Sequence, residues 1–537
     1  MKLDTVSLLS SIVMLASFAT IAEAGSACTV NAPNSGTVNG AALWGDVPMA
    51  KGQLSASTCD VDQFAWNNFL YLVGNDASGK PRFMSLAPWY DAMPKSGKPV
   101  WSGTYAPLQT AQMNKNMNHL QAGDAFHLLD VNGKTVSYDI RVNEDFVNYI
   151  AENGMYTIPA INQAAAAFNA DPSKGGIWLP PTTPTSTKSA LEIKTAWRDY
   201  GSKQSDCPAD TMHCEQDSAG NWWGLIGMHL VQKTPLHGEM IWASFEHVAN
   251  APDCAAGGSN PIKPNPAGLT NGWNLFNYTT YTNAGGDGTQ CTYPQSGVAN
   301  PLCLTNPNPS DDNKTWVSVN VCRTDQLPPA TNCDAAASNL AVTSCLNNNV
   351  QTNLPSTLNN KWKNYQLIGA EWGAWGAAAG QTTPLVGCFN IFDGNPKPGS
   401  SVGTLGLSCN PNNPNPPGES IMGIAGTKNL ANTTMETWMQ KDINLTTGPS
   451  TSPTTWTQQD CFSCHQPTTA SYQGDMSHLF GRAQQKTGDV PAGPIYSNSQ
   501  AEQQCPTVCA SADSTWNKQW TTTVPGKMSV CGCVANP

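Results

Sequence analysis

The chain has 537 residues, of which only 12% are charged, and its formal net charge is −11 with a pI near 5.1. This acidic balance argues against nucleic acid and against anionic membrane surfaces as partners. The 18 cysteines, 46 glycines and 40 prolines are typical of an exported, loop-rich protein with disulfide bonds.

The amino terminus has the pattern of a secretory signal. Lys2 is followed by a largely apolar run from Leu8 to Ile21, too short for a usual membrane span, and by the A-x-A sequence Ala22-Glu23-Ala24. We therefore expect residues 1–24 to be a signal peptide. The mature chain is expected in the periplasm or outside the cell, with no transmembrane segment.

Residues 25–253 are predicted to form a β-rich region with helices. Asn132-Gly133 is a strong hairpin signal between two runs of strand character. Asn143 and Gly154 are a helix cap and a helix stop. The predicted helices are 59–73, 143–153 and 159–170, and the predicted strands are 124–131, 135–142, 191–198, 222–233 and 239–248.

The rest of the chain is expected to add loops and a haem region. Residues 254–360 are rich in Asn, Pro, Gly and Cys and read as a cysteine-rich loop insertion with one strand near 315–322. Residues 361–420 return to the core through a strand at 365–375. Residues 421–537 are expected to hold a helical haem region, with helices near 430–440 and 476–485, and a cysteine-rich tail. The predicted fold class is α+β and β-rich, with an antiparallel sheet, packed helices and long disulfide-stapled loops.

The motif Cys461-Phe-Ser-Cys464-His465 predicts one covalently bound haem c. Two thiols at this spacing can reach the vinyl groups of a porphyrin, and His465 then ligates the iron as the proximal ligand. With so many cysteines, a redox pair or two separate disulfides are the alternatives.

The second axial position of that iron has three candidate ligands. Met476 and His478 follow the motif closely, and His229 lies on a predicted strand with a mostly apolar face. Each has a simpler reading as a packed or hydrogen-bonded core residue. Arg198 is a candidate for a haem propionate contact, or for an ion pair with a strand carboxylate such as Glu192.

If two cysteines hold haem, an even number of 16 remains for disulfides. The short separations favour Cys207–Cys214 and Cys505–Cys509 as local pairs. Cys531 and Cys533, one residue apart, are expected to bond elsewhere.

Six segments and the haem motif together resemble a known group of proteins. They are 64–70 (FAWNNFL), 138–144 (YDIRVNE), 192–198 (EIKTAWR), 227–234 (GMHLVQKT), 242–248 (WASFEHV) and 430–437 (LANTTMET). In this order they resemble the large exported single-haem "cytochrome c family" proteins of proteobacteria, over roughly residues 60–490. The resemblance implies covalent haem and a common fold, and it implies no reaction.

Electron transfer by an exported monohaem cytochrome is the leading functional hypothesis, with a basic redox protein as partner. A haem-dependent oxidoreductase of peroxidase or oxygenase type, with a substrate pocket in the N-terminal region, is the first alternative. A cell-surface or binding protein with structural haem is the second. The 18 tryptophans are compatible with a binding groove in which exposed indoles stack on sugars or aromatic compounds. Aromatic cores and haem pockets use the same residue, so this signal is not specific.

Overall fold

The computed structural model describes residues 27–32, 36–48, 56–94, 97–113, 128–170, 176–180, 189–235, 237, 240–253, 265–269, 271–279, 321–323, 327–331, 333–334, 338–375, 421–427, 432–437, 461, 465, 477–480, 489–511, 514–524 and 528–535. The expected signal peptide, residues 1–24, and residues 376–420 of the predicted return to the core lie outside these residues.

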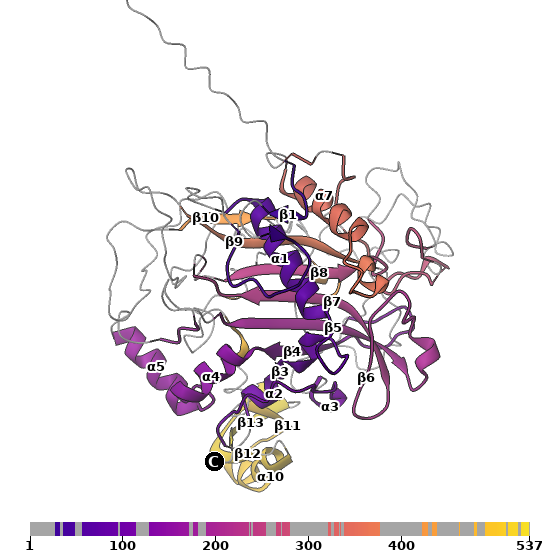
Figure 1. Ribbon diagram of the computed structural model, residues 1–537. Coiled ribbons are helices and arrows are strands. Elements are labelled where there is room, and N and C mark those ends of the chain that lie inside the picture. Colours follow the sequence, from indigo (N-terminus) through magenta and orange to yellow (C-terminus); the bar gives the residue numbers. More distant parts are fainter. Residues whose placement is uncertain are drawn as a thin grey trace, which may run out of the picture.

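One antiparallel sheet of eight strands forms the centre of the molecule (Figure 1). The order across it is β10-β9-β8-β7-β5-β4-β3, and the short β6 pairs with β7. The strands are β3 (Ala87–Pro88), β4 (Ser137–Val142), β5 (Leu191–Gly201), β6 (Cys214–Gln216), β7 (Trp222–Gln232), β8 (Ile241–His247), β9 (Tyr365–Trp375) and β10 (Ile421–Gly426). Apart from β6, strands that follow one another in the chain are neighbours in the sheet, which is the simplest antiparallel connection.

Two helices, α1 (Thr58–Val73) and α7 (Asn339–Thr352), pack together on one face of this sheet, over β8 and β9 (Figure 1). A capping box between Ser57 and Asp60 begins α1. The Phe69 ring stacks on Phe245 of β8 with 4.3 Å between centroids. These contacts place the largest apolar core between α1, α7 and the sheet.

The opposite face is covered by α2 (Trp89–Ala92), α4 (Glu144–Asn153) and α5 (Ile158–Ala170). The Asn143 side chain caps α4 by accepting a hydrogen bond from the Phe146 N–H, and Gly154 ends the helix with φ of 68°. Phe146 packs in a second cluster with Trp242 of β8 and with Phe480. Since strand residues alternate between faces, β8 contributes Phe245 to one core and Trp242 to the other.

The smaller elements lie at the edges of this framework. They are β1 (Asn31–Ala32), β2 (Gly36–Thr37), α3 (Thr110–Met113) and the 3₁₀ helices η1 (Arg82–Ser85), η2 (Gln204–Asp206) and η3 (Asn360–Asn364). Every helix in the described part of the chain falls short of the length and apolar character that a bilayer crossing requires.

Helix α7 lies inside the stretch that was expected to be loops. Its sequence contains many Asn and Thr residues, which are weak helix formers. Val342, Leu346 and Val350 recur every four residues and are buried. Tertiary packing of this stripe therefore outweighs local propensity. Of the strand predicted near 315–322, only Val321 and Cys322 are described, and they are not in a strand.

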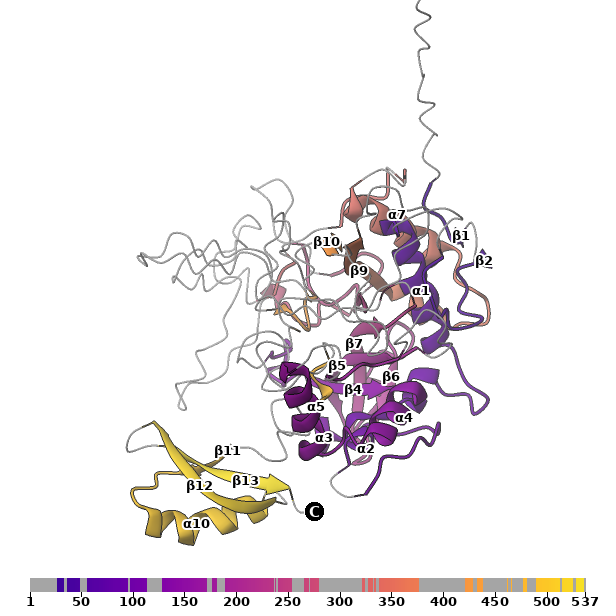
Figure 2. The same ribbon diagram turned by 90° about the vertical axis from the view of Figure 1, so that its left-hand side faces the viewer.

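A separate unit follows at the C-terminal end, drawn in yellow beside the main body in Figure 2. It consists of β11 (Asp489–Gly493), α10 (Asn498–Ser511), β12 (Ser514–Val524) and β13 (Met528–Ala535), with strand order β11-β13-β12. The fold class predicted from the sequence, an α+β protein with an antiparallel sheet and packed helices, is confirmed.

The disulfides confirm one predicted pair and contradict another. Cys207–Cys214 is present, together with Cys28–Cys59 and Cys333–Cys345. The prediction of Cys505–Cys509 was wrong, because the bridges are Cys505–Cys531 and Cys509–Cys533. Positions four apart on a helix share a face, as do positions two apart on a strand, so α10 is joined twice to β13. Cys531 and Cys533 bond elsewhere, as expected.

Candidate functional site

The C-terminal unit is held together mainly by its cysteines. Its buried apolar cluster is small: Ile495, Ala501, Cys505, Cys509, Cys531 and Cys533. A unit of this size buries too little apolar surface to be stable through packing alone, and disulfides commonly make up the difference. The two bridges fix α10 against β13 and so give the unit a rigid surface.

Two tryptophans of β12 flank this core. Trp516 lies opposite Cys533 and Trp520 lies opposite Cys531, so both indoles are on the side of the sheet that carries α10. The Trp520 Nε1–H donates to Asn498 Oδ1 at 2.9 Å, and the Trp516 Nε1–H donates to Gln519 O at 2.8 Å. Both side chains stay partly exposed. Orientated, half-exposed indoles offer an apolar ring face together with neighbouring polar groups.

An irregular turn in β12 separates the two tryptophans. The pairing with β13 shifts between Trp516 and Trp520, and Lys518 has φ of 69°. The Asn517 side chain folds over Gly532 of β13, where an added Cβ would lie 2.5 Å from Asn517 Oδ1. Amide and hydroxyl side chains are exposed along this part of β12, at Gln519, Thr521 and Thr522.

The predicted haem-attachment motif is only partly described. Cys461 is half-buried at the margin of the core beneath α4, and its N–H donates to Glu371 Oε2 of β9 at 2.8 Å. The His465 N–H donates to Cys461 O at 3.0 Å, the spacing of one helical turn. Cys464 lies outside the described residues. The described contacts therefore neither support nor contradict a bond to haem.

The His465 ring lies in an aromatic cluster. It stacks on His478 with 4.0 Å between centroids and 11° between planes, and it contacts Trp242 at 4.3 Å. The described contacts of His478 are thus aromatic packing against His465, and its role as an iron ligand stays a prediction from the sequence. Met476 lies outside the described residues.

His229 connects the sheet to the segment 432–437. Its Nε2 lies 3.1 Å from Glu436 Oε1. Burial acts to raise the pKa of Glu436, but the nearby His229 and Lys194 hold it below its usual value. Gly227 permits the close approach, because an added Cβ would lie 2.3 Å from Thr434 Oγ1. In the structure, His229 therefore links strand β7 to the segment 432–437 through its contact with Glu436.

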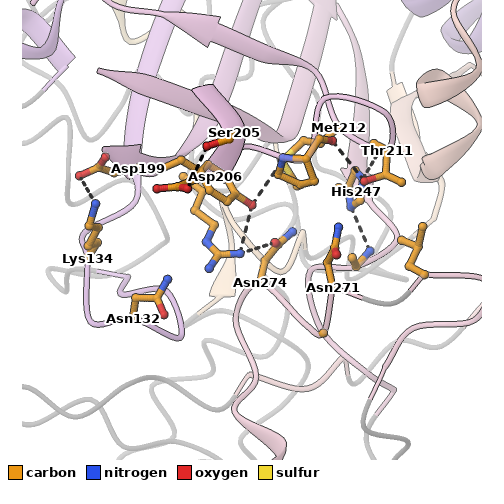
Figure 3. Close-up of a pocket in the computed structure, with 16 residues that line it drawn as sticks. Asn132, Lys134, Asp199, Ser205, Asp206, Thr211, Met212, His247, Asn271 and Asn274 are labelled. Atoms are coloured by element: carbon orange, nitrogen blue, oxygen red, sulfur yellow. Dashed lines mark hydrogen bonds and ion pairs between the residues drawn. The ribbon is translucent and has the colours of Figure 1, made fainter. Parts of the chain in front are cut away.

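Arg198 lies in a pocket of about 580 Å³ near the ends of β5 and β8 (Figure 3). Its Nε–H donates to Asp130 Oδ2 at 2.8 Å, and its Nη1–H donates to Asn274 Oδ1 at 2.8 Å. Asp130, rather than Glu192, is thus its ionic partner. None of Cys461, His465 and His478 lines this pocket.

His247, also in this pocket, has both ring nitrogens engaged. Nε2 lies 2.9 Å from Thr211 O, and Nδ1 accepts from the Ala249 N–H at 3.1 Å. Burial lowers the pKa of this imidazole to about 4, although the bond to Thr211 acts in the other direction. His247 is therefore neutral near pH 7, with its proton on Nε2.

A comparison with protein families gives a match at the C-terminal unit. Residues 498–533 are similar to the family described as "MVL: Mannan-binding protein". No curated protein and no solved structure matches the chain. The match covers α10, β12 and most of β13, and thus both tryptophans and both bridges.

This finding corrects the functional hypothesis drawn from the sequence. The resemblance to cytochrome c family proteins was wrong, since no such family matches, and the electron-carrier hypothesis and its basic redox partner lose their support with it. Trp516 and Trp520 were missed as site residues, although a W-x₃-W pattern between cysteine pairs was a usable signal. Over residues 498–533 the chain is similar to mannan-binding proteins.

Proposed function

We propose that this protein is an exported carbohydrate-binding protein whose C-terminal unit binds mannan. The observation that supports the proposal most directly is the similarity of residues 498–533 to mannan-binding proteins. It accords with the binding-protein alternative considered from the sequence, and it leaves the oxidoreductase alternative without support.

The chemistry of the unit supports the same ligand class. A sugar ring has an apolar C–H face that packs on an indole, and hydroxyls that exchange hydrogen bonds with amide and hydroxyl side chains. The surface around Trp516 and Trp520 offers both kinds of group. The two disulfides hold these groups in place before binding, which lowers the entropic cost of association.

The five described disulfides fit an oxidising compartment. Secretion to the periplasm or the cell exterior is part of the proposal. A protein in that location meets the polysaccharides of cell surfaces.

The function is tested by retention of the full chain on immobilised yeast mannan. We expect wild type to bind and Trp520→Ala to bind at least tenfold more weakly, because the change removes an indole face and its bond to Asn498. Trp101→Ala, which lies outside residues 498–533, is the matched control and should bind as wild type does. Circular dichroism verifies that each variant is folded. The proposal would be contradicted if wild type failed to bind mannan. It would also be contradicted if Trp520→Ala and Trp516→Ala both bound mannan as strongly as wild type does.

The cofactor is a separate matter. Covalent haem c at Cys461 and Cys464, with His465 as iron ligand, stays a prediction from the motif. In a carbohydrate-binding protein such a group would serve structure. The helical turn from Cys461 to His465 is compatible with it.

A further inference from the structure

The pocket near the ends of β5 and β8 is lined by residues from several separate parts of the chain. The turn after residue 130 contributes Asn132 and Lys134, and η2 contributes Ser205 and Asp206. Leu269, Asn271, Gly272 and Asn274 form a further part of the lining. Figure 3 shows these side chains around one space. Its volume of about 580 Å³ falls in the range of roughly 300–1,000 Å³ for small-molecule sites.

Buried polar side chains hold the pocket in shape. Arg198 and Asn274 are 8% and 3% exposed. Besides its bonds to Asp130 and Asn274, Arg198 donates to Tyr200 Oη at 3.1 Å. Asn274 in turn donates to Asn250 Oδ1 at 3.1 Å. Such a connected network is costly to rearrange, so the pocket is present before any ligand arrives.

Charge in the pocket is largely compensated. Lys134 Nζ lies 3.1 Å from Asp199 Oδ2, and Arg198 is paired with Asp130. Asp206, at the exposed rim, is the acidic side chain left over. A strongly anionic ligand would be repelled by the carboxylates of Asp199 and Asp206. A cation would be attracted by only one carboxylate without a cationic partner, that of Asp206. The balance favours a neutral, polar ligand.

The lining also argues against a metal ion. His247 has both ring nitrogens in hydrogen bonds to the main chain. Over the described part of the chain there is no group of three or more His, Cys, Asp or Glu side chains arranged to hold a metal. The ligand must therefore be recognised by hydrogen bonds and packing.

The rim presents groups that match vicinal hydroxyls. The Asn132 and Asn271 side-chain amides are exposed and make no hydrogen bond to a described residue, and each offers donors and an acceptor side by side. The Asp206 carboxylate can accept a charge-assisted bond from a hydroxyl. Leu269, which is half-buried, adds apolar surface for the C–H face of a ring.

We infer that this pocket is a second carbohydrate site, which binds one end or a short stretch of a neutral oligosaccharide. The choice of ligand class rests on the proposed function, since a mannan-binding unit on the same chain would present the pocket with neutral sugars. Among the residues that the structure describes, those that line the pocket lie between 132 and 274, outside the C-terminal unit.

The test is calorimetric titration of the full chain with linear mannotetraose. Ser205→Trp places a large side chain into the pocket from an exposed position. Ser202→Trp makes the same change at an exposed residue that does not line the pocket, and is the matched control. Trp520→Ala removes the other site. We expect two sites in wild type and in Ser202→Trp, one in Ser205→Trp, one in Trp520→Ala, and none in the double variant.

The outcomes separate the two proposals. If Ser205→Trp leaves the number of sites unchanged, or if the pocket binds galacturonate and not mannotetraose, the second site is overturned. If Trp520→Ala changes nothing while Ser205→Trp removes binding, the proposal for the C-terminal unit fails and the pocket stands. Asn132→Ala with Asn271→Ala should weaken the pocket site at least tenfold, and an unchanged affinity would also count against it.

Discussion

A single carboxylate between α1 and α7 makes the stability of the main body depend on pH. Asp62 is fully buried, and its Oδ2 accepts a hydrogen bond from Thr343 Oγ1 at 2.6 Å. No described residue forms a hydrogen bond with Oδ1. Burial raises the pKa of Asp62 to about 7, and the bond from Thr343 only partly opposes the shift. The group is therefore protonated in the native state at mildly acidic pH.

Replacing Asp62 by Asn should flatten the pH dependence of unfolding. The native pKa lies above the unfolded one, so the native state holds an extra proton between about pH 4 and pH 7. Wild type should lose stability as pH rises through this window, by up to roughly 4 kcal/mol. Asp62→Asn should lack that loss, as urea unfolding at pH 5 and pH 8 would show. Parallel pH profiles for the two proteins would refute this account.

The haem prediction is tested on the same scale. Expressed with a haem c maturation system, wild type should keep a haem stain after denaturing electrophoresis, because thioether bonds survive denaturation. Cys461→Ser with Cys464→Ser should abolish the stain, and Cys207→Ser with Cys214→Ser should keep it. A wild-type band without haem stain would show that the prediction of covalent haem is wrong.

Residues whose role depends on distant partners could not be predicted from the sequence. The pairing of Arg198 with Asp130 joins positions 68 apart, and that of His229 with Glu436 joins positions 207 apart. A local pattern shows the type of such a side chain and the face it occupies. It does not show which segment is folded against that face.

At the level of elements, the contribution of the N-cap of α4 to stability can be tested directly. Asn143 Oδ1 accepts from the Phe146 N–H at 3.2 Å and from the Leu191 N–H at 3.0 Å, so it joins α4 to β5. Asn143→Ala should lower the free energy of unfolding by about 2 kcal/mol, since both the cap and the partly buried bond from Leu191 are lost. Asn153→Ala, at the exposed end of the same helix, should cost much less. Urea unfolding curves of both variants provide the comparison.

The bridges of the C-terminal unit should control the heat resistance of sugar binding. The loop closed by Cys509 and Cys533 spans 24 residues, for which the loss of a disulfide costs about 3 kcal/mol. Cys509→Ser with Cys533→Ser should therefore lower the temperature at which mannan binding is lost. Cys207→Ser with Cys214→Ser, in the main body, is the control and should leave that temperature unchanged. If both variants lost mannan binding at the same lowered temperature, the bridges of the C-terminal unit would have no special role in the heat resistance of binding.

The sequence predicted elements well where local signals agreed with the packing. The capped helix at 143–153 and the strands at 191–198 and 365–375 have periodic apolar residues and clear ends, and the structure confirms them. Helix α7 was missed because its Asn-rich surface conceals a four-residue apolar repeat. Strands β12 and β13 were missed because cysteine and tryptophan, rather than aliphatic residues, form their inner face.

For the whole molecule, two sugar sites on one chain would make it a cross-linker. If both bind, one protein can hold two mannan chains, and avidity exceeds the affinity of either site. Wild type should precipitate soluble mannan, as turbidity would report. Ser205→Trp should still bind mannan but should not precipitate it. Precipitation by Ser205→Trp at the wild-type level would show that one site per chain is enough.

The connectivity of the cysteines has a consequence for biogenesis. In the main body each described bridge joins cysteines that are consecutive in the sequence, as in Cys207–Cys214. An oxidase that couples thiols in their order of emergence from a translocon would form these bridges correctly. In the C-terminal unit the same oxidase would first join Cys505 to Cys509, and the native interleaved pairs require reshuffling by thiol–disulfide exchange. Cells without a disulfide isomerase should therefore secrete chains in which the bridges of the main body are correct. The C-terminal unit of these chains should have mispaired disulfides and should not bind mannan.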